Sequence, residues 1–143
     1  MYKLEKSTTR DIDRLIEYKK QTILAFEKDI TDEEYNKVMN YIVNDINENL
    51  DKCMNIVLDN KIIGMVMLTD KDDGKLLDEL YIEEEYRNQG IGTDIIKNIL
   101  KENKIVYLWV YKANEKAISL YNRLGFKVVD ETEYRYLERY INE

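Results

Sequence analysis

The chain has 143 residues, of which 44% are hydrophobic and 36% charged, and its 29 acidic against 22 basic residues give a formal net charge of −7. This acidic balance argues against a nucleic-acid partner, because nucleic-acid binding draws mainly on Lys and Arg contacts to phosphate. With no His and one cysteine, Cys53, the chain cannot form an internal disulfide, and a metal site is not expected.

Size and hydropathy predict a single domain over residues 1–143. The longest apolar runs, such as Ile62–Ile63 and Met65–Leu68, are too short to span a membrane. The segment Met1–Lys6 lacks the apolar centre of a signal peptide. We therefore expect a cytoplasmic protein with no membrane partner.

The N-terminal third is expected to form a strand and two helices. Residues Tyr2–Glu5 are typical of a strand, and Ser7 or Thr8 can cap the first helix. Its apolar residues recur at helical spacing, at Ile12, Leu15, Ile16, Ile23 and Phe26. The second helix begins with a capping box, Thr31–Glu34. Its apolar stripe consists of Tyr35, Val38, Met39, Ile42, Ile46 and Leu50. We expect the stripes of both helices to pack in the core.

Three antiparallel strands are expected next. The segments Met54–Leu58 and Ile62–Leu68 flank the pair Asp59–Asn60, which is favourable in a tight hairpin turn. A second turn at Lys71–Gly74 leads into the strand Leu76–Ile82. The acidic cluster that follows this strand, residues 83–85, is expected to be a solvated turn.

The junction after this strand carries the pattern Arg87-x-x-Gly90-x-Gly92, followed by apolar residues at helical spacing. The first backbone N–H groups of a helix have no partner inside the helix, and the helix dipole leaves a partial positive charge there. Glycines let the main chain approach a bound group closely, and Arg87 adds a cation. The junction therefore predicts a cradle for phosphate, most naturally a pyrophosphate.

Two common phosphate-binding loops do not fit this junction. The dinucleotide-binding fingerprint requires a third glycine where Ile95 stands, and a Walker-type loop requires Gly-Lys-Ser/Thr, which is absent. Downstream, Ile105–Tyr111 is the strongest strand pattern in the chain. A helix over Asn114–Leu124, stopped by Gly125, precedes two final strands at Phe126–Val129 and Tyr134–Tyr140.

Two segments together resemble the GNAT superfamily of N-acetyltransferases. The first is Leu80-Tyr-Ile82 followed by Arg87-x-x-Gly90-x-Gly92. The second is Leu108-Trp-Val110 followed by Asn114-x-x-Ala117-x-x-x-Tyr121-x-x-x-Gly125-Phe126. The resemblance covers about two-thirds of the chain, from Ile56 to the C-terminus. Glu84 and Asn88 depart from it, because many members have proline and glycine at these two positions.

The resemblance implies an α/β, GNAT-like fold, with a mixed, mostly antiparallel central sheet of about seven strands and about four helices on its faces. It implies acetyl-CoA as co-substrate. The residues expected to hold its pyrophosphate are Arg87, Asn88, Gln89, Gly90, Ile91, Gly92 and Thr93. The backbone of Leu80, Tyr81 and Ile82 is expected to pair with the pantetheine arm, near Asn114.

Tyr121 corresponds to the family's tyrosine beside the thioester sulfur, where a phenol can protonate the departing thiolate. An acceptor amine must also lose a proton before it attacks. Glu79 is the favoured base, but Asp78 and ordered water stay open as alternatives, because neighbouring side chains on a strand point to opposite faces. The resemblance further implies an acceptor pocket walled by Tyr18, Phe26, Tyr35 and Met39.

The expected activity is transfer of an acetyl group to a primary amine by direct attack in a ternary complex, because no cysteine lies in either motif. One alternative is a GNAT-like module that binds acyl-CoA as a sensor without turnover, and another is acetylation of protein N-termini. The acceptor is left open by the sequence. Homodimerisation is also left open, with Tyr134–Tyr140 expected to offer an edge strand for it.

Overall fold

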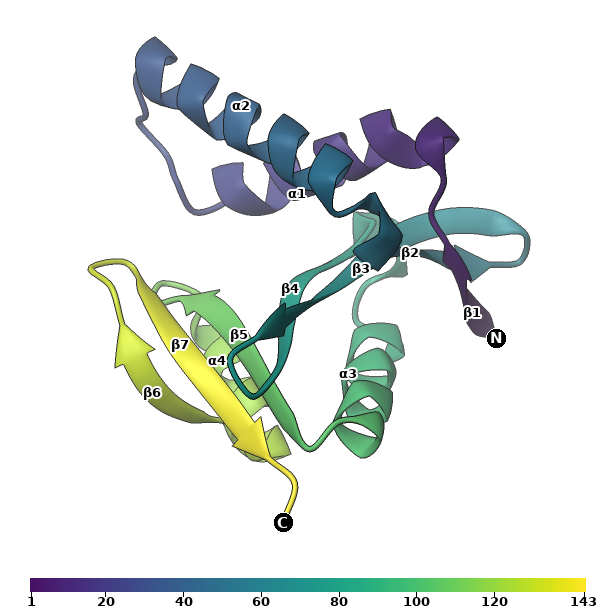
Figure 1. The fold of residues 1–143 in the computed structure, drawn as a ribbon, viewed down its shortest axis with the longest axis vertical. Coiled ribbons are helices and arrows are strands. Elements are labelled where there is room, and N and C mark those ends of the chain that lie inside the picture. Colours follow the sequence, from purple (N-terminus) through teal and green to yellow (C-terminus); the bar gives the residue numbers. More distant parts are fainter. The chain divides into compact units, whose positions relative to one another are not determined.

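The computed structural model describes residues 1–143 and confirms the expected α/β fold, a seven-stranded, mostly antiparallel sheet with four α-helices (Figure 1). The helices are α1 (Ile12–Leu24), α2 (Asp32–Glu48), α3 (Ile91–Glu102) and α4 (Glu115–Leu124). The strands are β1 (Tyr2–Lys6), β2 (Cys53–Leu58), β3 (Lys61–Lys71), β4 (Gly74–Ile82), β5 (Ile105–Tyr111), β6 (Lys127–Glu131) and β7 (Arg135–Ile141). None of the helices qualifies as a membrane span.

The strands are ordered β1-β2-β3-β4-β5-β7-β6 in the sheet. The one parallel pairing joins Lys75–Leu77 of β4 to Val106–Leu108 of β5. The chain divides into two compact units, the first comprising Met1–Met67 and Glu79–Tyr86 and the second Leu68–Asp78 and Arg87–Glu143. The expectation of a single domain stays a prediction, because a division of this kind can also lie within one domain.

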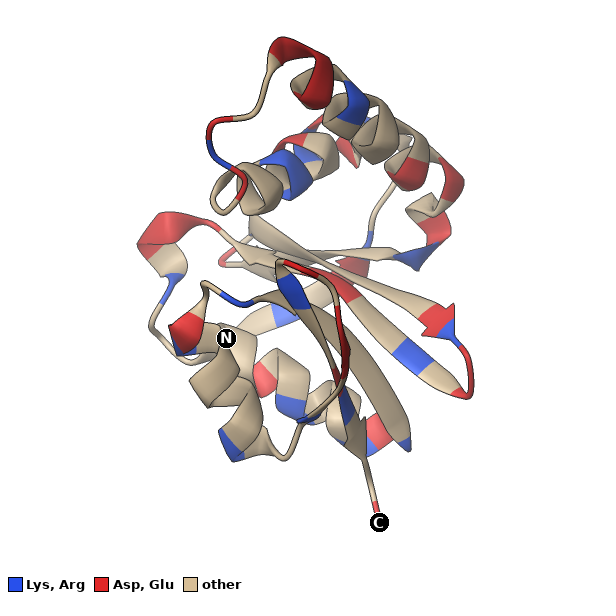
Figure 2. Ribbon diagram, turned by 90° about the vertical axis from the view of Figure 1, so that its left-hand side faces the viewer, with Lys and Arg blue, Asp and Glu red and all other residues tan.

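In the first unit, α1 and α2 run side by side (Figure 1). The predicted capping box starts α2, since Thr31 Oγ1 accepts a hydrogen bond from the Glu34 amide and Glu34 Oε1 accepts one from the Thr31 amide, both at 3.1 Å. Acidic residues gather at both ends of α2 (Figure 2). The core beneath the two helices consists of Leu15, Tyr18, Ile42, Ile46, Cys53, Met65 and Met67.

Two aromatic residues assigned to the apolar helix faces are not in this core. The helix α1 ends at Leu24, so Phe26 lies beyond it and is 37% exposed. Tyr35, in the first turn of α2, is 36% exposed. Helical spacing predicted both as core residues. The spacing continues past the point where α1 stops, and it does not show which turns of a helix lie over the sheet.

The residue types at the turns and helix ends suit the backbone conformations found there. Asp59 and Asn60 both have positive φ, at 50° and 64°, as a tight hairpin between β2 and β3 requires. Gly125 ends α4 with φ of 103°. A Cβ at Gly64 in β3 would collide with the carbonyl oxygen of Tyr81 in β4, so this position requires glycine.

The expectation that Tyr134–Tyr140 forms an edge strand is wrong. In the second unit β7 lies between β5 and β6, and β6 is the edge (Figure 1). Pairing explains this order, because β7 matches β5 along its whole length, from Arg135 with Tyr111 to Ile141 with Ile105. Every residue of β6 is exposed, as suits an edge strand.

Glu138, at the centre of β7, is an unusual core residue. Its side chain is fully buried, and neither carboxylate oxygen has a hydrogen-bond partner. Its paired residues on either side are Leu108 and Val128, which offer no polar group from their side chains. Burial raises the pKa of this carboxyl above its ordinary value, because a lone charge is costly away from water.

Replacing Glu138 with methionine is expected to stabilise the protein by about 1–3 kcal/mol near pH 8. Because the pKa is raised in the folded state, the wild type is relatively most stable below pH 4.5, where the carboxyl is protonated whether folded or unfolded. It loses stability as the pH rises through the raised folded-state value. Urea unfolding at a series of pH values measures this difference, which should narrow toward acid pH.

The matched control is Glu133→Met, which removes an exposed carboxyl two residues before β7. It should leave the free energy of unfolding almost unchanged. A Glu138→Met effect that is destabilising, or that has the same size at every pH, would contradict a protonated, unpartnered carboxyl.

Candidate functional site

The junction between β4 and α3 has the backbone geometry that its glycine pattern predicts. Asn88 and Gly90 adopt positive φ, at 63° and 86°, and α3 begins at the next residue, Ile91. The first helical hydrogen bond runs from the Asp94 amide to the Gly90 carbonyl at 3.0 Å. The amides of the three residues between them therefore stand at the open end of the helix, where no intrahelical acceptor exists.

The space beside Gly90 is open. A Cβ built at this position would meet no atom within 4 Å. The glycine is therefore required by its backbone conformation, and the main chain at the start of α3 can be approached closely from outside. An oxyanion placed here would meet backbone donors and the positive end of the helix dipole.

Asn88 stands where glycine is expected from the family resemblance, and it has the positive φ that glycine favours. Asparagine is one of the few residues other than glycine that adopt positive φ readily, so it can replace glycine at this turn. Its side-chain oxygen accepts a hydrogen bond from Lys116 Nζ in the first turn of α4 at 3.2 Å. The junction therefore has two nearby cations, Arg87 within it and Lys116 against it.

Sequence reasoning missed Lys116. It lies inside the second motif, between Asn114 and Ala117, but its position in the pattern is unspecified. The only signal available was that a lysine in the first turn of a helix opposes the helix dipole, which suggests another role for the charge.

Asn114 and Tyr121 both lie on or next to α4 in the second unit. Asn114 is the N-cap, and its side-chain oxygen accepts a hydrogen bond from the Ala117 amide at 3.3 Å. Tyr121 is half-buried two turns later, and its ring lies 5.7 Å from that of Phe126. Phe126 packs in turn against Tyr140 of β7, at 5.8 Å between ring centroids. These contacts hold the Tyr121 ring in place.

The candidate base Glu79 belongs to the first unit. Its side chain is 7% exposed, so it is a buried acid and not an acid at a solvated strand edge. Thr22 Oγ1 of α1 donates a hydrogen bond to Glu79 Oε1 at 3.1 Å. Asp78, the alternative base, belongs to the second unit and is half-buried.

The expectation of a solvated turn at residues 83–85 is wrong for Glu83. Tyr18 of α1 donates its hydroxyl proton to Glu83 Oε2 at 2.5 Å, and the Tyr18 ring stacks on Tyr81 at 4.6 Å. Burial and the neighbouring Glu83 carboxylate raise the pKa of the Tyr18 phenol well above its usual range. One face of α1 therefore holds two carboxylates, Glu79 and Glu83, through Thr22 and Tyr18.

The Tyr18–Glu83 hydrogen bond should be measurable as a coupling energy. In a double-mutant cycle of Tyr18→Phe and Glu83→Gln, the coupling in the free energy of unfolding is expected to be about 1–3 kcal/mol, because the hydroxyl donor is buried and would lose its partner. Pairing Tyr41→Phe with Glu83→Gln serves as the control, since Tyr41 is 55% exposed. A coupling free energy of zero between Tyr18→Phe and Glu83→Gln would contradict this hydrogen bond.

A family model described as the acetyltransferase (GNAT) family matches residues 16–126. The chain is 31% identical over 72 residues to the spermine/spermidine N(1)-acetyltransferase of Bacillus subtilis, which covers 46% of this chain and 47% of that protein. It is 31% identical over 71 residues to the peptidyl-lysine N-acetyltransferase YjaB of Salmonella typhimurium, covering 50% and 46%. The matches therefore span less than half the length of these curated relatives.

A solved structure supports the fold over the whole chain. The PaiA N-acetyltransferase of Thermoplasma acidophilum, crystallised in complex with coenzyme A, superposes with a TM-score of 0.70. The alignment covers 99% of both chains at 24% sequence identity. This likeness is evidence for the fold, which is the mixed sheet and helix order described above.

Proposed function

Because the chain belongs to the GNAT family of acetyltransferases, we propose that it is an N-acetyltransferase that moves the acetyl group of acetyl-CoA to a primary amine. The observation that carries the proposal is the junction before α3. Left-handed backbone at Asn88 and Gly90, open space beside Gly90 and two cations together suit a diphosphate.

Each part of this junction has a separate task in the proposal. The amides at the start of α3 donate hydrogen bonds to the diphosphate oxygens, and Arg87 and Lys116 offset their charge. The contact between Lys116 and Asn88 holds the lysine at the junction before the co-substrate arrives. The proposed roles of Leu80, Tyr81 and Ile82 along the pantetheine arm rest on the family resemblance.

In the transfer step the amine nitrogen attacks the thioester carbonyl carbon, a C–N bond forms and the C–S bond breaks. The thiolate that leaves needs a proton, and Tyr121 is the proposed donor. Its ring projects from α4 and packs against Phe126, and this contact restricts where the hydroxyl can lie. The proton that the ammonium group must lose goes to a base, for which Glu79 is proposed, with Asp78 and water as the alternatives.

The acceptor is proposed to be a cationic amine. Glu79 and Glu83 are ionisable acids held against α1, and such groups favour a positively charged substrate. The names of two relatives point the same way, because polyamines and peptidyl lysine both carry a primary ammonium group. Acetylation of a protein N-terminus is the second acceptor class to be tested in the same assay.

Acetyl-CoA binding can be measured by isothermal calorimetry. Arg87→Gln and Lys116→Gln are each expected to weaken binding about tenfold, through loss of a charge-assisted contact to phosphate. Gly90→Asp should abolish it, since it places a carboxylate and a strained backbone at the junction. The control Lys101→Gln removes the same charge from the last turn of α3 and should bind like the wild type. Equal affinity in all variants would refute the diphosphate cradle.

Turnover can be followed by thiol release from acetyl-CoA with a panel of polyamines, lysine peptides and peptides with free N-termini. Tyr121→Phe is expected to lower turnover about 10²–10⁴-fold while leaving acetyl-CoA affinity unchanged. The control is Tyr134→Phe, whose ring is 69% exposed. Full activity in Tyr121→Phe would remove its role as acid.

The same assay separates an enzyme from a sensor and tests the base. Tight binding without thiol release on any amine would identify an acyl-CoA sensor. In an active protein, Glu79→Gln should flatten the acidic limb of the pH–rate profile if Glu79 is the base. If the acidic limb of the pH–rate profile is unchanged in Glu79→Gln, the general base is Asp78 or water.

A further inference from the structure

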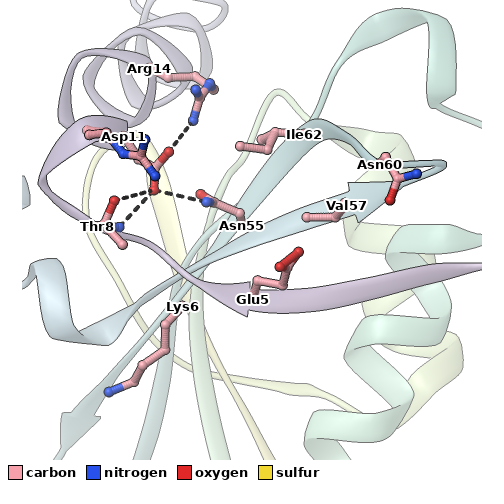
Figure 3. A pocket seen from close by; sticks show the side chains of 10 residues that line it. Glu5, Lys6, Thr8, Asp11, Arg14, Asn55, Val57, Asn60 and Ile62 are labelled. Atoms are coloured by element: carbon pink, nitrogen blue, oxygen red, sulfur yellow. Dashed lines mark hydrogen bonds and ion pairs between the residues drawn. The ribbon is translucent and has the colours of Figure 1, made fainter.

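A cleft of ≈ 560 Å³ lies in the first unit, and none of its lining residues has a role in the proposed transfer site (Figure 3). It is formed by β1, the 3₁₀ turn Thr9–Asp11, the first turn of α1 and the hairpin of β2 and β3. Its volume is in the range of cavities that hold small organic molecules. The function proposed above makes no use of it.

A buried carboxylate organises one end of the cleft. Asp11 is 7% exposed and accepts hydrogen bonds from the Thr8 amide at 2.7 Å, Arg14 Nη1 at 2.7 Å and Asn55 Nδ2 at 3.0 Å. Burial alone would raise its pKa, but these hydrogen bonds outweigh it and lower the pKa to about 2. Asp11 is therefore ionised and fully occupied, and it fixes the Arg14 guanidinium in place (Figure 3).

Two arginines that line the cleft have guanidinium donors that make no hydrogen bond. Arg14 uses one terminal nitrogen for Asp11, which leaves its other terminal nitrogen and Nε. Arg10, which also lines the cleft, makes no hydrogen bond or ion pair. Lys6 contributes no charge to this end, since its side chain points away from Asp11, Arg14 and Asn55 (Figure 3). The polar groups of the cleft that can still bind a ligand are therefore the guanidinium N–H donors of Arg10 and Arg14.

The rest of the cleft has a different character. Val57, which is 6% exposed, and the half-buried Ile62 give it an apolar floor. Glu5 stands over this floor and has only a weak partner, Lys3, at 3.8 Å. A second negative group on a ligand would be repelled by Glu5, so the cleft suits a molecule with one anionic end and an apolar body.

We propose that this cleft binds a small organic anion that has a single anionic group, a carboxylate or a phosphate, held by Arg10 and Arg14, and an apolar body that rests on Val57 and Ile62. Guanidinium forks match both oxyanions, because each offers two oxygens in one plane. No residue that lines the cleft is among the proposed contacts of acetyl-CoA.

The test is a titration of the full chain followed by ¹H–¹⁵N NMR, with benzoate, phenyl phosphate and benzyl alcohol as probes of equal body and different charge. Benzoate or phenyl phosphate should give saturable shifts at the amides of Thr8, Asp11 and Asn55, and neutral benzyl alcohol should not. The favoured anion identifies which oxyanion the site takes. Absence of saturable shifts with both anions, or equal shifts with the alcohol, would overturn the proposal.

Variants assign the binding to the two arginines. Arg10→Gln should weaken anion binding at least about fivefold, and Arg14→Lys should do so through loss of the fork while keeping a charge beside Asp11. Lys28→Gln, which removes an exposed charge outside the cleft, should leave the affinity unchanged. Wild-type affinity in both arginine variants would refute the site.

Anion binding at the α3 junction is separated from the cleft by Arg87→Gln. This change should leave the shifts at Thr8, Asp11 and Asn55 intact. If they disappear in Arg87→Gln, the anion binds at the junction and the cleft proposal fails, whereas the proposed acetyl-CoA site stands.

Discussion

The left-handed backbone at Asn88 and Gly90 is the constraint on which the proposed transfer site depends. A chain that leaves an extended strand must turn sharply to begin a helix with its first amides facing outward. Positive φ makes such a turn, but it costs an ordinary residue about 1–2 kcal/mol. Glycine avoids that cost and asparagine reduces it, so the residue types at positions 88 and 90 follow from the turn. The empty space beside Gly90 then leaves the helix end open to a ligand.

How much of this molecule is predictable from its sequence depends on how local the determining interactions are. The capping box at Thr31 and the stop at Gly125 involve neighbours within a few residues, and both were predicted correctly. The motif order then fixed the fold class through the family resemblance. The length of α1 was less certain, because its apolar spacing continues to Phe26 although the helix ends at Leu24.

Interactions between distant residues were beyond the sequence. The hydrogen bond between Tyr18 and Glu83 joins residues 65 positions apart, and that between Lys116 and Asn88 joins residues 28 apart. The position of β7 inside the sheet depends on pairing between whole strands. Neither composition nor period specifies such partners, since an exposed acid and a buried, hydrogen-bonded acid look the same in a sequence. The partners of Glu79 and Glu83, and the position of Lys116 at the junction, were therefore visible only in the structure.

The buried ionisable groups show how hydrogen-bond and ion-pair partners from distant parts of the chain determine what a buried charge can do. Lys19 is 3% exposed and is paired with Asp45 at 2.5 Å, and Asp11 is surrounded by donors, so both can keep their charge inside the protein. Glu138 has no hydrogen-bond partner, so its burial favours the neutral acid and raises its pKa. Glu79 falls between these cases, because it is buried and has Thr22 as a neutral donor. A hydroxyl donor stabilises the charged form of a carboxylate, and a carboxylate in a poorly solvated place interacts strongly with an ammonium group. Its burial and the hydrogen bond from Thr22 are therefore the physical argument for Glu79 as the residue that receives the proton of an amine.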